Sequence, residues 1–456
     1  MIDTEIKELE NDIQEVVNLF TTPQGVNLRH RVKITESKIV NTITVNGNVY
    51  SYGNLVPILN DEIVKKRLIK RYVKLSVYKA LCKFFNKEMP WGALTGIRPT
   101  KLAYFERENN GEFEEFFTDV MRVSEQKTKL VSQIIESQKG IYCKDENSTD
   151  FFVFIPFCPS RCKYCSFITA DIKHNEQYVD SYVDTLIREI KRSAEYVKTL
   201  KSIYIGGGTP VALDDKNLDK VLSAIDGINS GVEYTVEAGR PDRITKENLN
   251  ILKAHGVTRI CINPQTFNDK TLISLGRNHT SREIEEKYFL AKDKFDINMD
   301  LIAGLPDENF EDFKYSLDKT ISLSPDDITV HTLCIKKGSF LSQEEDRVSS
   351  LEVEKMVDYS YNALCNNSYK PYYMYRQKYM AGNLENVGYC KEGKACTYNV
   401  NTMEETSNTI ACGANAISKK VFFNENRIER YASPKDVKTY LSKIDTILKD
   451  KDKFFN

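Results

Sequence analysis

The first part of the chain carries two hydrophobic patterns in succession. Residues 27–34 and 38–52 alternate between apolar and polar positions, and the second run contains Asn46-Gly47, which is a hairpin signal. This pattern predicts a small antiparallel sheet. From Glu62 to Phe85 the apolar positions recur at helical spacing instead, which predicts a helix.

The middle of the chain alternates between short apolar runs and helical patterns. The runs that predict strands are residues 152–155, 203–205, 232–238, 259–263, 297–303 and 328–334. The patterns that predict helices are residues 176–200, 246–255, 282–295 and 310–323. Strands that alternate with helices in this way imply a parallel sheet with right-handed crossovers.

Length and composition describe a globular protein of several domains. The chain has 456 residues, 28% of them charged, and a net charge of −1, so no overall bias towards nucleic acid or membranes is present. The N-terminus lacks the profile of a signal peptide and no stretch reaches the length of a membrane span, which predicts a cytoplasmic protein. A polar stretch near residue 145 suggests an N-terminal accessory domain (1–145), a core (146–345) and a C-terminal substrate-covering domain (346–456).

Three cysteines follow the first strand of the predicted core. Cys158, Cys162 and Cys165 lie on one short segment, and neighbouring prolines keep that segment a loop. Three thiolates on one loop can hold three corners of a cubane iron–sulfur cluster and leave the fourth iron without a protein ligand. A zinc site or three structural thiols are the alternatives. Zinc normally takes a second Cys or His pair at a regular distance, and the sequence contains no such pair.

The spacing C-x3-C-x2-C resembles the signature of the radical S-adenosylmethionine (SAM) enzymes. In that family the open iron chelates SAM, and one electron from the reduced cluster splits the sulfonium to give a 5′-deoxyadenosyl radical. The resemblance therefore implies a [4Fe-4S] cluster on these cysteines, SAM as a second cofactor, and a reducing electron donor such as flavodoxin or ferredoxin.

Glycines and polar residues stand at the ends of the predicted strands. Residues 203–205 run into Gly206-Gly207-Gly208-Thr209, where the backbone can approach a ligand closely, although a tight turn is the simpler alternative. Glu237, Gln265 and Asp300 lie at or near the carboxyl ends of later strands, where ligands bind in folds of this type. Buried polar groups need partners, so these three either satisfy one another or face a polar cofactor.

Four segments extend the resemblance to one group of the radical SAM enzymes. Residues 235–238, 263–267, 275–279 and 298–306 resemble the oxygen-independent coproporphyrinogen III oxidases. The resemblance implies a partial (β/α)6 barrel of the radical SAM type, with an N-terminal α+β accessory domain and a C-terminal α+β extension. It also implies that the SAM site comprises Gly207, Gly208 and Thr209 near the amino group, Glu237 at the ribose, and Gln265, Arg277 and Asp300 along the pocket. Arg277 as a helix cap and Asp300 as a holder of its own loop are the structural alternatives.

The same group implies a tetrapyrrole substrate and no nucleic acid. Its oxidoreductase activity is the oxidative decarboxylation of coproporphyrinogen III propionates to the vinyls of protoporphyrinogen IX, in anaerobic heme biosynthesis. Arginines are the natural bidentate clamps for such carboxylates, and Arg240, Arg243 and Arg376 are the candidates. The aromatic stripe of residues 372–380, which also carries Lys378, suits a flat ligand with carboxylates, or is an ordinary edge strand.

Some positions depart from the oxidases. The oxidases carry Tyr-x-His where this chain has Phe152 and Phe154, and a further cysteine where it has Phe167. The heme-chaperone branch carries His-Asn-x-x-Tyr-Trp, whereas residues 398–403 here read Tyr-Asn-Val-Asn-Thr-Met. The C-terminal segments and residues 90–101 look most like the HemZ-like coproporphyrinogen dehydrogenase subgroup. Three functions stay open: the oxidation, a radical methyl transfer that opens heme, and a non-catalytic heme or tetrapyrrole carrier.

Overall fold

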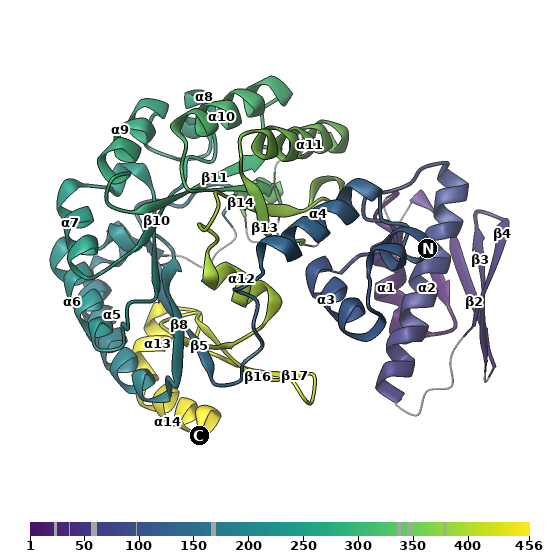
Figure 1. Ribbon diagram of the computed structural model, residues 1–456, viewed down its shortest axis with the longest axis horizontal. Helices are drawn as coiled ribbons and strands as arrows, with labels where there is room; N and C mark the ends of the chain where they lie inside the picture. The colour runs from purple at the N-terminus through teal and green to yellow at the C-terminus, as the bar shows by residue number, and fades with distance from the viewer. Residues whose placement is uncertain are drawn as a thin grey trace. The chain divides into compact units, whose positions relative to one another are not determined.

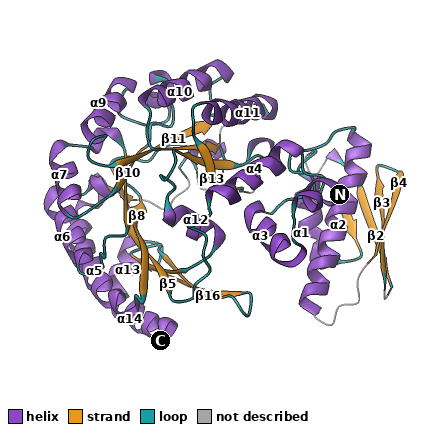
Figure 2. Ribbon diagram, in the orientation of Figure 1, coloured by secondary structure: helices purple, strands orange, loops and turns teal. Residues whose placement is uncertain are grey.

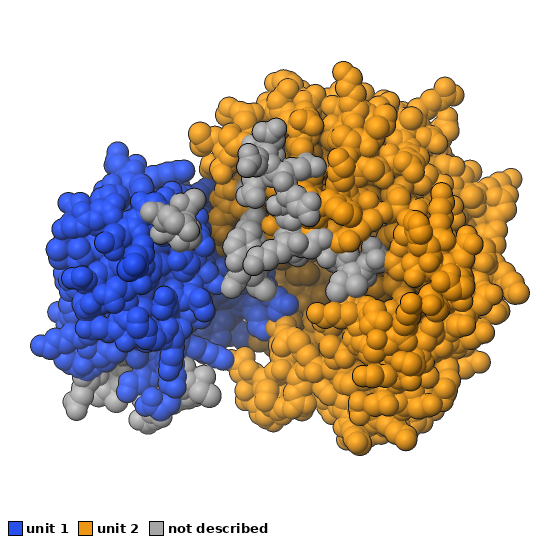
Figure 3. All heavy atoms as spheres, turned by 180° about the vertical axis from the view of Figure 1, so that it is seen from behind, with its two compact units in different colours: residues 1–132 blue, residues 133–456 orange. Residues whose placement is uncertain are grey.

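The chain forms two compact units, residues 1–132 and residues 133–456 (Figure 3). The computed structural model describes residues 1–21, 25–35, 37–55, 62–96, 98–165, 170–335, 339–343, 349–377 and 380–456. Phe167 and Lys378, which the sequence singled out, lie outside the described residues. The three predicted domains stay a prediction, and the first unit ends before the boundary that the polar stretch suggested.

Unit 1 combines a small sheet with helices. Its elements are β1 (Ile2–Thr4), β2 (Leu28–Ile34), β3 (Lys38–Val45), β4 (Asn48–Leu55), α1 (Glu10–Val17), α2 (Glu62–Phe85), α3 (Pro99–Asn110) and the start of α4 (Glu125–Ser137). The predicted hairpin is confirmed, because Asn46 and Gly47 join β3 to β4 with φ of 46° and 90°, the left-handed values of a tight hairpin turn. The predicted helix from Glu62 to Phe85 is also confirmed. Helix α3 was not predicted; it begins at a proline, whose missing N–H costs nothing in the first turn.

Unit 2 is built on six parallel strands in the order β12-β11-β10-β9-β8-β5. The strands are β5 (Ser148–Ile155), β8 (Thr199–Gly207), β9 (Glu233–Gly239), β10 (Arg259–Ile262), β11 (Asp296–Ala303) and β12 (Asp327–Thr332). Figures 1 and 2 show them as an arc with helices along its outer side. Strand β5 pairs with β8 and β15, and β12 pairs with β11 and β14, so the two strands do not pair with each other. The predicted partial (β/α)6 barrel is therefore confirmed.

Amphipathic helices cover the outer side of this arc (Figure 1). They are α5 (Ile172–Ser193), α6 (Asp215–Asp226), α7 (Lys246–Ala254), α8 (Asp269–Ser274), α9 (Ser281–Ala291), α10 (Phe310–Leu323) and α11 (Ser350–Asn366). Capping boxes at Thr245, Thr280 and Asn309 fix where α7, α9 and α10 begin. Apolar side chains of the helices and of alternate strand positions form one continuous core between the two layers. No helix in the described ranges has the length and apolar character needed to cross a membrane.

The predicted helix over residues 176–200 is wrong at both ends. Helix α5 begins at Ile172, because the Asp171 side chain accepts a hydrogen bond of 2.9 Å from the Lys173 N–H and caps the first turn. It ends at Ser193, and β8 already begins at Thr199, opposite Ser148 of β5. The last two residues of the predicted helix, Thr199 and Leu200, instead pair with β5 as the start of β8. Tertiary contacts override local helical propensity here.

The C-terminal segment extends the sheet at both edges. Beyond β12 lie β14 (Asn386–Cys390) and β13 (Lys370–Tyr375), and beyond β5 lie β15 (Asn408–Cys412), β16 (Ile417–Phe422) and β17 (Arg427–Ala432). Helix α12 (Thr397–Glu404) lies on the inner side of the arc in Figures 1 and 2, while α13 (Val437–Ser442) and α14 (Ile444–Phe455) contact α5. The C-terminal segment thus completes the walls around the inner face of the same sheet.

Candidate functional site

A cavity of about 610 Å³ lies on the inner face of the six-stranded sheet, within the usual size range of small-molecule pockets. Side chains along each strand alternate between this cavity and the helices, because strand residues point to opposite faces in turn. On β9, for example, Thr235 and Glu237 line the cavity, whereas Val236 and Ala238 lie in the core. The inner face is therefore polar at positions where a parallel sheet covered on both sides would be apolar.

All three predicted cluster ligands, Cys158, Cys162 and Cys165, line this cavity. A short strand β6 (Phe157–Cys158) pairs with β7 (Ala170–Asp171) and holds the first cysteine, and the Cys165 N–H donates to the Cys162 carbonyl over 3.1 Å. Among the described residues, no three His, Cys, Asp or Glu side chains converge closely enough to hold a single metal ion. A cubane places each cysteine sulfur on a different iron, and the three predicted ligands all line one cavity.

The glycine triplet packs directly under the cysteine loop. The Gly208 N–H donates to the Ile155 carbonyl over 2.7 Å. A Cβ at Gly208 would lie 2.5 Å from the Phe157 carbonyl oxygen and 3.0 Å from the Cys158 sulfur, which is too close for any side chain. The next residue, Thr209, lies with its hydroxyl oxygen 3.6 Å from the same sulfur. Gly207, Gly208 and Thr209 all line the cavity, and their role at a ligand stays a prediction.

Two guanidinium groups lie against the middle cysteine. Nη1 of Arg240 is 3.5 Å from the Cys162 sulfur, and Nη1 of Arg277 is 3.9 Å from it. Arg277 is fixed by a hydrogen bond of 2.8 Å to the Tyr164 hydroxyl and by the Asn263 carbonyl. This positive charge would balance the negative charge of a sulfur-ligated cluster.

Arg240 is itself held by a carboxylate. Its Nε and Nη2 donate to the two oxygens of Asp242 over 2.8 and 3.1 Å. Although burial raises the pKa of Asp242, the interactions with His279 and Arg240 outweigh it and hold that pKa well below its usual range. Arg240 was predicted to clamp a substrate propionate, yet these contacts commit its guanidinium to Asp242 and Cys162.

The other two predicted substrate arginines do not line the cavity. Nη2 of Arg243 donates to the Ala212 carbonyl over 3.3 Å. Arg376 is 3% exposed and donates to the Asn383 carbonyl over 2.8 Å, and burial lowers its pKa to about 10. The structure therefore brings only Arg240 of the three into the site, and a clamping role for any of them remains a prediction.

Two carboxylates face the cavity from neighbouring parts of the sheet. The Tyr204 hydroxyl donates to Glu237 over 2.6 Å, and the Asn298 amide donates to Asp300 over 2.7 Å. Burial, reinforced by the negative charge of Asp300, raises the pKa of Glu237 to about 7, and the hydrogen bond from Tyr204 limits the rise. A pair of carboxylates suits a ligand that brings several N–H and O–H donors and a positive charge.

Polar atoms without a partner point to the same kind of ligand. The side-chain oxygens of Gln265 and Thr235 are buried, and within the described residues neither has a hydrogen-bond partner. Both residues line the cavity. Gln265 also has a φ of 69°, a left-handed conformation that residues other than glycine adopt infrequently. SAM offers ribose hydroxyls, amino groups and a sulfonium, so the donors it brings fit the acceptors that this site leaves open.

An aromatic wall, consisting of Phe152, Phe154, Tyr204 and Tyr398, forms another side of the cavity. The rings of Tyr204 and Tyr398 stack with centroids 4.2 Å apart, and Phe152 lies nearly parallel to both at about 6 Å. Tyr398 reaches this wall because Glu233 accepts hydrogen bonds from the first N–H groups of helix α12. Phe152, Phe154 and Tyr398 are among the positions at which the chain departs from the oxidase and heme-chaperone motifs.

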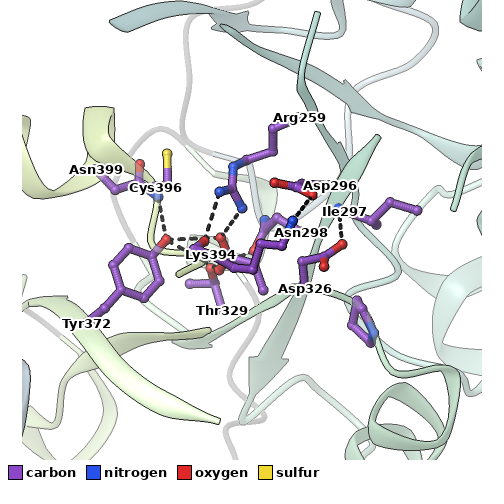
Figure 4. A network of polar contacts seen from close by, with 12 residues as sticks. Arg259, Asp296, Ile297, Asn298, Asp326, Thr329, Tyr372, Lys394, Cys396 and Asn399 are labelled. Atoms are coloured by element: carbon purple, nitrogen blue, oxygen red, sulfur yellow. Dashed lines mark hydrogen bonds and ion pairs between the residues drawn. The ribbon is translucent and has the colours of Figure 1, made fainter. Parts of the chain in front are cut away.

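The floor of the cavity is a buried ion network at the amino ends of the strands (Figure 4). Arg259 pairs with Asp327 at 2.7 Å and donates to the Lys394 carbonyl at 2.8 Å. The Tyr372 hydroxyl lies 3.2 Å from Asp327 and accepts a hydrogen bond of 3.1 Å from Asn399. Here, in contrast to the Gln265 region, most polar groups find partners within the protein.

Sequence reasoning found the cysteines, the glycines and the strand-end polar residues but missed most of the inner wall. Missed residues that line the cavity are Tyr204, Thr235, Arg259, Asn298, Asp327, Thr329, His331 and Tyr398. A signal was present in the alternation Asp327-Ile328-Thr329-Val330-His331, since a parallel strand buried on both faces should be continuously apolar. Polar residues at every second position indicate a strand that faces a polar lumen.

Comparisons with known proteins identify the family of the chain. Residues 152–320 match the model of the Radical SAM superfamily. The chain is also 34% identical, over 90% of its length and 87% of the relative's, to the oxygen-independent coproporphyrinogen-III oxidase-like protein HemZ of Bacillus subtilis. The chain belongs to the radical SAM superfamily. Within it, this radical SAM protein falls in the oxygen-independent coproporphyrinogen III oxidase-like group.

Other relatives carry different names. The heme chaperone HemW of Bacillus subtilis is 33% identical over 41% of this chain and 50% of its own length. HemW of Escherichia coli is 27% identical over 61% of this chain and 72% of its own. Among solved structures, the coproporphyrinogen III oxidase HemN of Escherichia coli matches 68% of this chain and 72% of its own with a TM-score of 0.54 and 20% identity, a likeness of fold.

A [4Fe-4S] cluster and SAM are the cofactors of the radical SAM superfamily, as the cysteine spacing implied. The residues of this chain fit both groups. Three cysteine sulfurs on one cavity, with two guanidiniums beside one of them, suit the cluster, and the open acceptors at Gln265, Glu237 and Asp300 suit the nucleoside. The assignment of single residues to SAM atoms remains a prediction.

Proposed function

We propose that this radical SAM protein is an enzyme that acts on a tetrapyrrole and oxidatively decarboxylates the propionates of coproporphyrinogen III to vinyl groups. The observation that carries the proposal is that a single cavity joins the cysteine loop, two carboxylates and the aromatic wall. Such a cavity suits a polar cofactor and a large apolar ring side by side. The name of the HemZ relative, which aligns over 87% of its length, supports the same reaction.

The atoms and electrons of the proposed reaction balance as follows for each propionate. When bound, the reduced cluster and SAM supply a carbon-centred radical that takes one hydrogen atom from the β-carbon of a propionate. The side chain then releases one carbon dioxide and one electron, so a vinyl group remains. Two propionates converted in this way give protoporphyrinogen IX. An external acceptor takes the electron, and a reductant such as flavodoxin or ferredoxin reduces the cluster, in the cytoplasm.

The chain's own residues have separate tasks in this proposal. Cys158, Cys162 and Cys165 hold three irons of the cluster. Glu237 and Asp300 accept hydrogen bonds from the nucleoside and orient it, which places the reactive carbon and the substrate C–H side by side. The aromatic wall contacts the macrocycle and keeps water away from the radical.

A non-catalytic tetrapyrrole carrier is the second candidate. It is supported by the heme chaperones among the relatives, which align with up to 75% of their length. Phe152 and Phe154 also stand where the oxidases carry polar side chains. Against it, a carrier has no use for the unpartnered Gln265 oxygen or for guanidiniums beside Cys162.

Anaerobic reconstitution of the full chain followed by product analysis tests the proposal. With a reductant, SAM and coproporphyrinogen III, we expect 5′-deoxyadenosine together with two losses of the mass of formic acid from the substrate. A methyl gain on heme would instead identify a heme-opening methyltransferase. Tetrapyrrole binding with no 5′-deoxyadenosine above background would identify a carrier, and either result would overturn the decarboxylation.

A further inference from the structure

A histidine and a tyrosine that the proposed function does not use lie beside Asp300. His331 is in β12 and Tyr375 is the last residue of β13, and both line the cavity. Residues of β12 stand beside those of β11 in parallel register, with Thr329 next to Asp300 and His331 next to Ile302. The two side chains therefore approach the Asp300 carboxylate from the carboxyl-end side.

The imidazole of His331 is held between the two neighbours. Its Nδ1 is 3.3 Å from the Tyr375 hydroxyl, and its Nε2 is 3.7 Å from Oδ2 of Asp300. When the tyrosine donates to Nδ1, the ring proton resides on Nε2 and faces the carboxylate. The hydrogen bond to one ring nitrogen thus determines whether the other nitrogen carries a proton and acts as a donor. The residues that support binding sites often use histidine in this way.

Asp300 is supported on both of its oxygens. Oδ1 accepts from the Asn298 amide over 2.7 Å, and the Asn298 carbonyl oxygen accepts from Thr329 over 3.1 Å. Oδ2 faces His331. Contacts on both oxygens restrict the Asp300 side chain, so its remaining lone pairs are presented to a ligand with less further loss of side-chain freedom.

Two residues of β5 offer no such support. Phe152 and Phe154 of β5 face the cavity with rings that offer no hydrogen-bonding atom. Glu237 is bonded by one side chain of the protein, Tyr204, and burial leaves its pKa near neutrality. The β11–β12 side, where His331 lies beside Asp300, therefore contributes a second supported carboxylate to the polar orientation of a ligand.

We propose that His331, oriented by Tyr375, is a positioning residue that fixes the Asp300 carboxylate for the N–H and O–H donors of SAM. The proposal rests on the radical SAM part of the proposed function and is independent of which tetrapyrrole is the substrate. It adds two residues to the cofactor site, one from the core strand β12 and one from the C-terminal strand β13.

Equilibrium binding of SAM to the cluster-loaded full chain tests this role. His331→Leu removes both nitrogens, and we expect the dissociation constant for SAM to rise about tenfold, as for losses in the supporting shell of other sites. Tyr375→Phe removes only the hydroxyl, with an expected rise of about threefold. His331→Gln keeps an N–H within reach of Asp300 and should restore binding to within about threefold of the parent.

Kinetics separate positioning from chemistry. In His331→Leu, KM for SAM should rise while kcat at saturating SAM stays within about twofold of the parent, because a residue that only orients the cofactor is dispensable once the cofactor is bound. The electron paramagnetic resonance spectrum of the reduced cluster without SAM should be unchanged, which shows that the cluster itself is intact.

Two matched variants control for the loss of a histidine or a hydroxyl elsewhere. His255→Leu removes an imidazole that lies between Asp219 and Asp226, and Tyr359→Phe removes a hydroxyl bonded to Asp318 at 2.6 Å; neither residue lines the cavity. Both should bind SAM like the parent. Parent-like binding by His331→Leu overturns the proposal, as does a loss confined to kcat. If the parent itself does not bind SAM, the proposed function is overturned as well. That outcome is distinguishable, because the parent and every variant would then show the same lack of binding.

Discussion

The two ends of the cavity differ in how their buried polar groups are paired. At the carboxyl ends of the strands, the side-chain oxygen of Gln265 has no hydrogen-bond partner within the described residues. At the amino ends, Arg259 and Asp327 form a buried ion pair that other residues extend into a network (Figure 4). Each unpaired buried polar atom costs about 1–3 kcal/mol, so the open end is maintained at the expense of stability. The comparison indicates that the upper end serves ligands and the floor serves the fold.

The largest expected effect at the upper end comes from the middle cysteine. Cys162→Ala removes one of three sulfurs, and we expect the [4Fe-4S] cluster and SAM cleavage to be lost together, because a loop with two thiolates no longer holds three irons. Iron and sulfide content, the visible spectrum and 5′-deoxyadenosine formation measure this loss. Cys143→Ser, at an exposed cysteine that does not line the cavity, is the matched control. An unchanged cluster spectrum in Cys162→Ala would refute the ligand assignment.

The largest expected effect at the floor is on stability. Arg259→Met leaves Asp327 as an uncompensated charge in a pair whose side chains are 4% and 1% exposed, so unfolding should become easier by about 3–5 kcal/mol. Circular dichroism in a urea series measures it, since the only tryptophan, Trp91, lies in unit 1.

Removing an arginine from an exposed ion pair should lower the free energy of unfolding only slightly. Arg188→Met breaks an ion pair with Asp445 whose side chains are 57% and 72% exposed, and it should cost at most about 1 kcal/mol. If Arg259→Met were no more destabilising than Arg188→Met, the floor would not be the stabilising end of the cavity.

A substitution in the glycine triplet should have an effect of intermediate size on cluster incorporation. Gly208→Ala forces the cysteine loop away from a Cβ that would lie 2.5 Å from the Phe157 carbonyl oxygen, at a cost of about 1–3 kcal/mol. We expect reduced cluster incorporation, measured as iron per chain after reconstitution. Gly227→Ala is the control, because its Cβ would meet no atom within 4 Å and its φ is −67°. Equal iron content in the two variants would contradict the close packing of triplet and loop.

The sequence predicted the upper end of the cavity better than the floor. Cys158 and its partners lie within one loop, and helix α10 follows a local capping signal at Asn309, so both could be recognised from neighbouring residues. Tyr398 and Arg259 depend on partners more than a hundred residues away, such as Glu233 for α12 and the Lys394 carbonyl for Arg259. Residue type alone also suggested Arg376 as a clamp, because a sequence shows a cation but not the carbonyl that already binds it.

The smallest expected effect concerns pH at the upper end. Burial, together with Asp300, raises the pKa of Glu237 to about 7 from a usual value of 4.5. Because the folded protein holds this proton more tightly than the unfolded chain, Glu237 contributes stability below pH 4.5 that is lost as the pH rises from 4.5 to 7. The carboxylate that forms above this pKa is the form that attracts a sulfonium and accepts hydrogen bonds.

SAM binding to the parent should therefore strengthen about tenfold between pH 6 and pH 8, owing to the ionisation of Glu237. The amino group of SAM titrates in the same range, so the decisive quantity is the difference between the parent and Glu237→Gln, whose pH dependence should be flatter by that factor. Equal slopes would mean that Glu237 does not meet the cofactor. The raised pKa of Glu237 would then result from the fold alone. In that case the two ends of the cavity would be more alike than the Gln265 oxygen, which has no partner among the described residues, suggests.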